Sequence, residues 1–387
     1  MSDRARHLIE GVRKFSPLLQ TFEAGYTIEQ VKASVHATLR PEFRNCDLLE
    51  QYGIDLLTVE ATNVEKLKRR PDAYTLFTAC MDARRALLDL NPDQCSRICA
   101  DWEQEIGRGL HFFWNSARME VDKSDLALDE FVYEAFRNIG SLLEATMLPY
   151  LRELLQLREA LNGTHLAKME IAAMDFGSVV SRLERWIATD VLRPQPQNLP
   201  INQWRNIAQH FSVSQQGDRV LCHYGKALKR TLELTRDELW EVLIALFSIH
   251  SALRTAHTIF FLDHGSILAK HCTGYTRKDS DLQFQFIVGA ASQGFEVTAI
   301  SVQGGLARAT LKDCTIANAR DRGIHASQFV LGLWIATKAN ELEIEYVTKA
   351  GSPHLRAHAV GSDCELVHSG DRDMSYLAGT VELTLCG

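Results

Sequence analysis

The sequence lacks the marks of a secreted or membrane-spanning chain. It contains no stretch of eighteen or more apolar residues, and it begins with the polar run Ser2, Asp3 and Arg4 rather than with a signal peptide. Its nine cysteines include no Cys-x-x-Cys pair; Cys95 and Cys99 are four apart, as on one face of a helix. An odd number of thiols without paired spacing suits a reducing compartment. We therefore expect a cytoplasmic protein with no membrane attachment.

An excess of positive charge is also missing. The net charge is −7, and each third of the chain carries more acidic than basic groups. A protein that coats nucleic acid through long-range attraction is therefore disfavoured, and any contact with RNA must be local, at a cleft with a few Arg and Lys side chains. The one compact basic run, residues 65–70, is more typical of a solvated helix end than of a nucleic-acid patch.

The spacing of apolar residues predicts three domains. Residues 1–125 show apolar positions three and four apart, interrupted by prolines, and are expected to form a helical N-terminal domain. Residues 126–264 are expected to form a helical bundle; it opens with a long helix that Pro149 kinks, and residues 219–234 add a small hairpin. Residues 275–387 alternate around Gly-rich turns, which is typical of a small α+β domain. The fold class is therefore mainly α with a C-terminal α+β region.

Five strands and one helix are predicted within residues 275–387. The strands cover residues 282–288, 295–302, 307–315, 342–347 and 354–360, and the helix covers residues 326–339.

The stretch from Pro200 to Phe211 carries the chemistry that we consider most informative. On a helix, Trp204, Ile207, Ala208 and Phe211 fall on one apolar stripe, and the polar residues take the opposite side. Pro200 suits the entry and Asn202 is a plausible N-cap. Arg205, Asn206 and His210 are therefore expected at the surface of a firmly anchored helix. A permanent cation, an amide and a titratable imidazole together suit phosphodiester chemistry.

Spacing alone does not carry this interpretation. With 29 Arg and 14 His in 387 residues, an Arg and a His at one fixed separation coincide roughly once by chance. A second example runs from Arg320 to His325. There Gly323 weakens a helix and the apolar stripe is absent, so we favour the first stretch.

Histidine recurs in two patterns that resemble metal sites, and neither is convincing. The first has a step of seven residues, which is longer than a helix turn, and its last two members are expected past the helix end; the second has irregular spacing in a strand-like context. We therefore expect no metal and no cofactor. The two sets are His250, His257, His264 and His271, and His354, His358, Cys364 and His368.

Arg205, Asn206, three further residues and His210, within a unit of long helices, resemble the signature of the HEPN superfamily: Arg, then Asn, Asp or His, then three to five residues, then His. Residues 136–140 in the first long helix also resemble that superfamily's opening helix. The resemblance covers residues 126–264, about a third of the chain.

The resemblance implies an endoribonuclease that uses no metal, with Arg205 and His210 as the catalytic pair and Asn206 as their polar companion. Imidazole suits acid–base work and guanidinium binds phosphate oxygens. Because Arg205 and His210 point about 140° apart around the helix, two copies of the helix across a two-fold axis would make a fuller site, and HEPN proteins generally work as dimers. We therefore expect a homodimer with RNA as its substrate.

Two further expectations concern partners. HEPN proteins with extra domains often act as toxins or anti-phage defence effectors, so a regulatory protein or antitoxin is a possible partner. In some relatives a Tyr two residues after the His is modified by a nucleotidyltransferase antitoxin; Ser212 stands there in this chain, which puts that partner in doubt. The alternative from another functional class is a non-catalytic dimeric helical scaffold with a ligand-sensing C-terminal domain.

Overall fold

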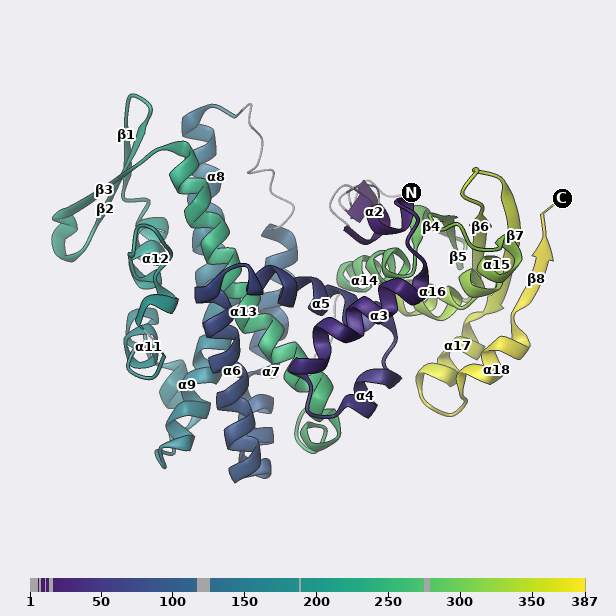
Figure 1. Cartoon of the computed structure of the whole chain (residues 1–387), viewed down its shortest axis with the longest axis horizontal. Coiled ribbons are helices and arrows are strands. Elements are labelled where there is room, and N and C mark those ends of the chain that lie inside the picture. Colours follow the sequence, from purple (N-terminus) through teal and green to yellow (C-terminus); the bar gives the residue numbers. More distant parts are fainter. Residues whose placement is uncertain are drawn as a thin grey trace. The chain divides into compact units, whose positions relative to one another are not determined.

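The computed structural model describes residues 6, 8–10, 12–13, 17–116, 126–187, 189–274 and 279–386. Its contacts divide the chain into two compact units. The helical unit contains residues 39–49 and 60–276, and the sheet unit contains residues 1–38, 50–59 and 277–387. Helices predominate, and a five-stranded sheet lies in the C-terminal part (Figure 1). The predicted fold class, mainly α with a C-terminal α+β region, is confirmed.

The division into units differs from the three predicted domains. The expected boundary at residue 125 lies outside the described residues. The helices on either side of it belong to one unit, because α6 (Pro71–Leu90) and α7 (Pro92–Ser116) pack against α9 (Leu148–Leu161), and α7 also packs against the turn before α9. Residues 1–38 instead belong to the unit that contains the C-terminal sheet, since α2 (Pro17–Glu23) packs against α14 (Asp279–Ser292). Local periodicity predicted the helices of the N-terminal region but not which of them share a core.

Long helices build the helical unit, and two begin at prolines that the sequence marks as breaks. Pro71 and Pro92 occupy the first turn of α6 and α7, where a missing N–H costs nothing. The elements are α4 (Cys46–Gln51), α5 (Ile54–Lys68), α6 (Pro71–Leu90), α7 (Pro92–Ser116), α8 (Leu128–Ser141), α9 (Leu148–Leu161), α10 (Lys168–Ala172), α11 (Phe176–Leu183), α12 (Ile201–His210) and α13 (Arg236–Leu268), with short turns η1 (Arg40–Glu42) and η3 (Thr189–Leu192). The boundary between the units runs through α4 and α5.

A π-helical turn, Leu142–Met147 (η2), separates α8 from α9 where the sequence predicts a kink. Pro149 has no N–H to donate to the carbonyl of Ala145, four residues earlier. That carbonyl faces α7, and a Cβ at Gly109 would lie 3.0 Å from its oxygen. Gly109 therefore allows α7 to approach the turn closely, and the hydroxyl of Thr146 donates to the carbonyl of Gly109 at 3.3 Å.

A small antiparallel sheet follows α12. It consists of β1 (Val213–Gln216), β2 (Arg219–Tyr224) and β3 (Arg230–Leu234), and a short turn η4 (Lys226–Leu228) joins the last two. The predicted hairpin corresponds to β2 and β3, and β1 adds a third strand that the sequence analysis did not predict. Figure 1 shows this sheet beside α12.

Helix α13 begins with the predicted capping box. The side chain of Thr235 accepts from the N–H of Glu238 at 3.1 Å, and Glu238 accepts from the N–H of Thr235 at 2.7 Å. Among the described residues, α13 is the one helix long and apolar enough to cross a membrane, but 56% of its most apolar window is buried within the protein. The burial of α13 among α6, α7 and α8 is compatible with a core helix of a soluble protein.

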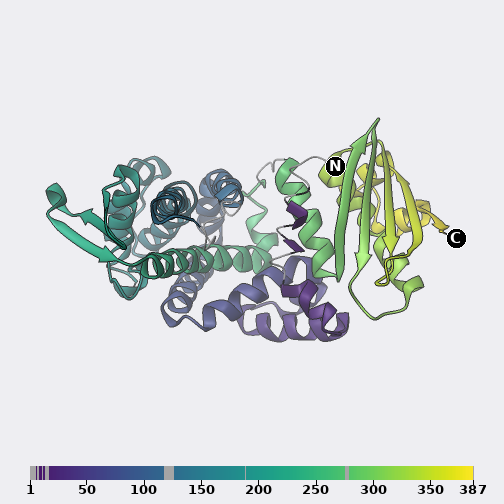
Figure 2. The same cartoon turned by 90° about the horizontal axis from the view of Figure 1, so that it is seen from above.

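The sheet unit places helices against a mixed sheet, seen edge-on in Figure 2. The order is β4-β5-β6-β7-β8; β5 and β6 are parallel and the other neighbours are antiparallel. Helices α14, α15 and α16 pack against the strands. The elements are α2 (Pro17–Glu23), α3 (Ile28–Leu39), α14 (Asp279–Ser292), β4 (Phe295–Gln303), β5 (Leu306–Asp313), α15 (Ala319–Ser327), α16 (Phe329–Thr337), β6 (Glu341–Val347), β7 (Pro353–Val360), α17 (Gly361–His368), α18 (Met374–Thr380) and β8 (Glu382–Leu385).

One predicted strand is wrong: residues 282–288 belong to α14. Gln283 and Gln285 alternate with apolar residues, which is typical of a strand, but the segment packs against α16 and β4 as a helix. The other four predicted strands correspond to β4, β5, β6 and β7, whereas β8 was not predicted.

Candidate functional site

Helix α12 is anchored by one buried face, as predicted, but its ends differ from the prediction. Trp204 and Ile207 are fully buried. Pro200, not Asn202, is the N-cap, because its carbonyl accepts the first helical hydrogen bond, from Gln203 at 2.9 Å. Phe211 does not continue the buried stripe: it ends the helix in the left-handed conformation, with φ of 44°, and remains 47% exposed.

Arg205 lies on α12 and is held by a carboxylate from the π-helical turn. Its Nε donates to Oε2 of Glu144 at 2.7 Å and its Nη2 donates to Oε1 at 3.1 Å. Both side chains remain about one-third exposed, Arg205 at 28% and Glu144 at 35%. The hydrogen bonds to Glu144 raise the pKa of Arg205, so the guanidinium is charged and fixed in its plane.

Asn206 continues this constellation toward solvent. Its Oδ1 accepts a hydrogen bond from Nη1 of Arg205 at 3.2 Å, and the residue is exposed. Glu144 was missed by the sequence analysis, although a single carboxylate between the apolar residues Leu143 and Met147 was a signal in the printed sequence. The structure therefore brings Arg205, Asn206 and Glu144 together.

His210 is the last residue of α12 and is exposed. Within the described part of the chain, no hydrogen bond or ion pair of its imidazole is found, and it does not contact Arg205. The aromatic ring next to it in the chain packs on α8: Phe211 lies edge-on to the exposed Tyr133, with ring centroids 6.1 Å apart, and to the buried Phe136 at 6.4 Å. One helix thus presents the predicted residues outward without joining them into one site.

The segment of α8 that resembles the HEPN opening helix supports α12 through packing. Ala208 of α12 faces Gly140, where a Cβ would lie 3.5 Å from the alanine methyl group. Asn138 is buried and donates to the carbonyl of Glu134 at 2.9 Å, whereas Arg137 is exposed and pairs with the carboxylate of Glu134 at 3.6 Å. The contacts of Asn138 and Arg137 lie within α8, whereas Gly140 is the residue that faces α12.

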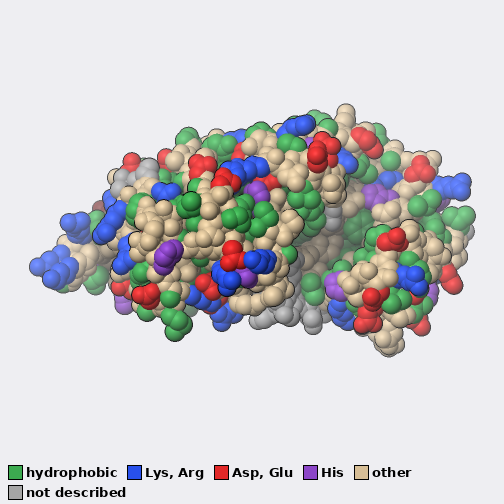
Figure 3. Space-filling model, turned by 90° about the horizontal axis from the view of Figure 1, so that it is seen from below, with side chains coloured by type: hydrophobic (Ala, Val, Ile, Leu, Met, Phe, Trp, Pro, Cys, Tyr) green, Lys and Arg blue, Asp and Glu red, His purple; other side chains and the backbone are tan. Residues whose placement is uncertain are grey.

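The sheet that follows α12 contributes further polar groups. The imidazole of His223 lies between two hydroxyls: its Nε2 is 3.1 Å from Oγ of Ser214 and its Nδ1 is 3.1 Å from Oγ1 of Thr231. The N–H of Gly225 donates to Oε1 of Gln203, on the first turn of α12, at 3.2 Å. Figure 3 shows Lys and Arg side chains gathered at the end of this sheet.

The second Arg–His stretch, from residue 320 to 325, does form a helix, α15, contrary to the expectation from Gly323. A Cβ there would lie 3.3 Å from Leu355 and from Tyr346, so the glycine allows α15 to pack closely on the sheet. Arg322 is buried on this helix; its Nε donates to both carboxylate oxygens of Asp313 at 3.2 and 3.3 Å.

His325 belongs to the same buried network. Its Nδ1 is 2.7 Å from Nη1 of Arg322, and burial lowers its pKa to about 4. The network is closed on itself inside the sheet unit, which is typical of a structural ion pair rather than of a site.

The two histidine patterns do not converge on a metal position. Among the described residues, no group of three or more His, Cys, Asp or Glu side chains could hold a metal ion. The regular part of α13 ends at His264, whose φ of −128° and ψ of 21° are not helical, and His271 lies beyond Leu268, the last residue of α13. In the second set, His358 approaches Glu341 at 3.8 Å whereas the ring of His368 lies against Trp334, so these side chains face different neighbours.

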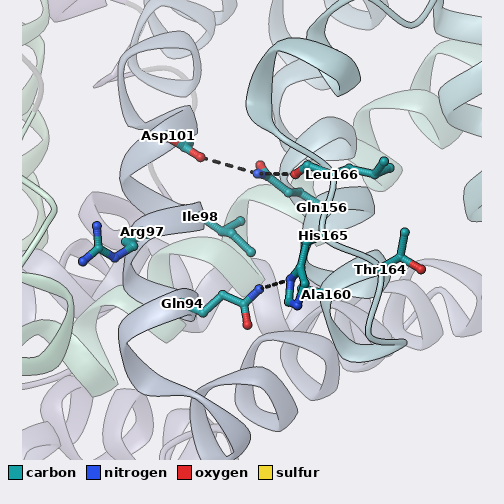
Figure 4. Close-up of a pocket in the computed structure, with 9 residues that line it drawn as sticks. All are labelled: Gln94, Arg97, Ile98, Asp101, Gln156, Ala160, Thr164, His165 and Leu166. Atoms are coloured by element: carbon teal, nitrogen blue, oxygen red, sulfur yellow. Dashed lines mark hydrogen bonds between the residues drawn. The ribbon is translucent and has the colours of Figure 1, made fainter.

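A shallow cleft of about 190 Å³ lies between α7 and the loop after α9 (Figure 4). Gln94 contacts Nδ1 of His165 at 2.9 Å, and the amide of Gln156 donates to Asp101 at 3.4 Å and to the carbonyl of Leu166 at 3.2 Å. These polar groups are paired with one another, and none is a predicted site residue. We assign the cleft no chemistry.

Comparison with known proteins adds no further constraint. No protein family matches the chain, and no curated protein and no solved structure matches it.

Proposed function

We propose that the chain is a metal-independent endoribonuclease of the HEPN type whose site is completed by a second copy of the chain. The observation that carries the proposal is the exposed side of α12, where Arg205, hydrogen-bonded to Asn206, and the exposed imidazole of His210 lie on a helix anchored by one buried face. These are the residues that the resemblance implies.

Metal-independent RNA cleavage needs three functional groups. A base removes the proton from a 2′-hydroxyl, whose oxygen then attacks the adjacent phosphorus; a cation stabilises the charge on the pentacoordinate phosphate; and an acid protonates the departing 5′-oxygen. His210 suits the first or the third task and Arg205 suits the second. Because one imidazole cannot be both base and acid in the same step, a pair of copies meets the requirement better than one.

The bond between Arg205 and Glu144 is compatible with phosphate binding. A guanidinium carries five N–H groups, and three of them are used by Glu144 and Asn206. The two that remain belong to Nη1 and Nη2. Glu144 thus acts as a positioning residue that fixes the plane of the guanidinium, while it lowers the net charge that a phosphate would meet.

Exposed aromatic side chains support a homodimer. Tyr133 is 55% exposed and Phe211 is 47% exposed; Phe211 follows His210 in the chain, and Tyr133 packs against Phe211. Aromatic residues are enriched at the centres of protein interfaces. A second copy seated on this pair would bring a second His210 close to the first.

The experiment is cleavage of a labelled RNA by the purified full chain and its variants. We expect Arg205→Ala and His210→Ala each to lower the rate by at least about 100-fold, the scale of a lost acid–base or electrostatic group. Arg69→Ala and His165→Ala are controls at exposed positions outside α8 and α12 and should leave the rate unchanged. EDTA should have no effect. Cleavage that survives both α12 variants, or that the wild-type chain never shows, would refute the proposal.

The ion pair between Arg205 and Glu144 also favours a second candidate function, a non-catalytic dimeric scaffold. If the only role of Arg205 is to tie α12 to the π-helical turn through Glu144, its loss should lower the midpoint of thermal unfolding while RNA remains intact in every sample. In that case the sheet unit would be the candidate for binding a ligand.

A role as a toxin or defence effector, held by a regulatory protein or antitoxin, extends the first proposal. Its support is the presence of a second unit beside the helical one. Expression of the full chain in a bacterium should slow growth, and the His210→Ala variant should not.

A further inference from the structure

The loop that joins β2 and β3 carries an unusual local charge for this acidic chain. Residues 219–230 contain four basic residues and no acidic one. Three of them, Lys226, Lys229 and Arg230, lie within five positions of one another and are exposed. We call these three residues the basic tip.

The basic tip is not neutralised by its neighbours. Arg219, the fourth cation, pairs with Glu233 at 3.6 Å, so it does not add a free charge. For Lys226, Lys229 and Arg230, no ion pair is found among the described residues. Three like charges within one turn repel each other, and nothing in the described part of the loop offsets this cost.

The backbone of the loop is held in a conformation that its residues do not favour. Ala227 and Leu228 have φ of 57° and 53°, in the left-handed region that costs a non-glycine residue free energy. Leu228 is also 53% exposed. The loop therefore combines unfavourable charge, unfavourable backbone and an exposed apolar side chain, which is the pattern expected when a partner stabilises a segment.

The loop is tied to α12. Gly225, which precedes the basic tip, donates to Gln203 at 3.2 Å, and Asn206 follows Gln203 by one turn of the same helix. The loop that carries the basic tip is therefore held against the first turn of α12, and Figure 1 shows the sheet of β1, β2 and β3 beside that helix.

We infer that the basic tip binds the phosphate backbone of single-stranded RNA and guides it along α12. The inference rests on the proposed function for its choice of partner. Phosphates spaced along a strand match three adjacent cations, and Leu228 provides a surface for an unstacked base. An anionic membrane is the weaker alternative, because one exposed leucine offers little area for insertion.

The test is binding of a fluorescein-labelled, fully 2′-O-methylated RNA of twenty nucleotides, which has the phosphates but cannot undergo attack by a 2′-hydroxyl. Fluorescence anisotropy with the full chain, from 50 to 300 mM KCl, gives the affinity and its dependence on salt. The variant Lys226→Gln/Lys229→Gln/Arg230→Gln removes the basic tip. The matched control, Lys66→Gln/Lys68→Gln/Arg69→Gln, removes three exposed cations at the end of α5.

Removal of three phosphate contacts should weaken binding about tenfold to hundredfold at 100 mM salt and reduce the slope of log K against log salt by about 2. The control variant should match the wild type in both quantities. Equal affinity and slope in the two variants would overturn the inference even if unmodified RNA is still cleaved, so its failure is distinct from that of the proposed function. Loss of binding to phosphatidylserine vesicles with unchanged RNA binding would also overturn it.

Discussion

Lowering the pH from 7 to 5 is expected to destabilise the helical unit, because two histidines of α13 are buried in their neutral form. Burial lowers the pKa of His250 to about 3 and that of His257 to about 4. The groups that face His257 are Glu153, whose charge opposes this change, and Arg84 and Arg254, which add to it. The ring of His257 also stacks on Phe261, with centroids 4.2 Å apart.

The sign and the magnitude follow from the difference in protonation. Between pH 6.5 and the lowered values, the unfolded chain binds protons that the folded chain does not, so the free energy of unfolding falls as the pH falls. With an unfolded pKa of about 6.5, each histidine should cost about 2 kcal/mol between pH 7 and pH 5. The loss should stop below the lowered values, where both states are protonated.

The assay is urea unfolding followed by tryptophan fluorescence at pH 7.0, 6.0 and 5.0. Five of the six tryptophans belong to the helical unit; Trp334 belongs to the sheet unit, and its replacement by Phe leaves signals from the helical unit alone. The His257→Phe variant keeps the ring stack but cannot titrate. Its loss of stability over this range should therefore be smaller than that of the wild type by about 2 kcal/mol.

Two results would refute this reasoning. One is a free energy of unfolding that stays constant from pH 7 to pH 5. The other is an equal loss in the wild type and in His257→Phe, which would mean that carboxylates alone set the acid sensitivity.

Three further predictions concern single contacts. Glu144→Gln should loosen the plane of Arg205 and change the pH profile and rate of RNA cleavage by about tenfold, whereas an unchanged profile would limit Glu144 to packing. Glu153→Leu should lower the free energy of unfolding by about 3–5 kcal/mol because it leaves the buried Arg84 unpaired; adding Arg84→Met should recover most of it, and no recovery would contradict the ion-pair account. Gly361→Ala should destabilise the sheet unit by about 1–3 kcal/mol, measured by thermal unfolding, because its Cβ would lie 2.3 Å from a backbone oxygen. An unchanged free energy of unfolding would contradict this account and show that the backbone moves to make room.

Local sequence patterns predicted many of the helices. The prolines before α6 and α7, the capping box at Thr235 and Glu238, and the apolar spacing of α3 are signals between neighbours in the chain, and the structure has helices there. The predictions that were wrong concern residues whose structure depends on contacts with distant segments. The run at residues 282–288 is helical in its packed context, and Gly323, which the sequence predicts to weaken a helix, instead allows a close contact with the sheet.

The candidate site shows the same limit. The outward positions of Asn206 and His210 follow from the helical period of α12, which a sequence reveals. The partner of Arg205 is sixty-one residues earlier in the chain and lies in a π-helical turn, whose geometry no periodic pattern predicts. The role of these residues in cleavage stays a prediction.

The sheet unit is assembled from stretches that leave the ribosome at very different times. Helices α2 and α3 end before residue 40, and α14, against which α2 packs, begins after residue 276. At about 5–20 residues per second, roughly 240 residues of synthesis separate them, so about 10–50 seconds pass before the partner exists. During that interval the side chain of Phe22, which lies beside Gly294 in the folded unit, has no late-made partner to bury it.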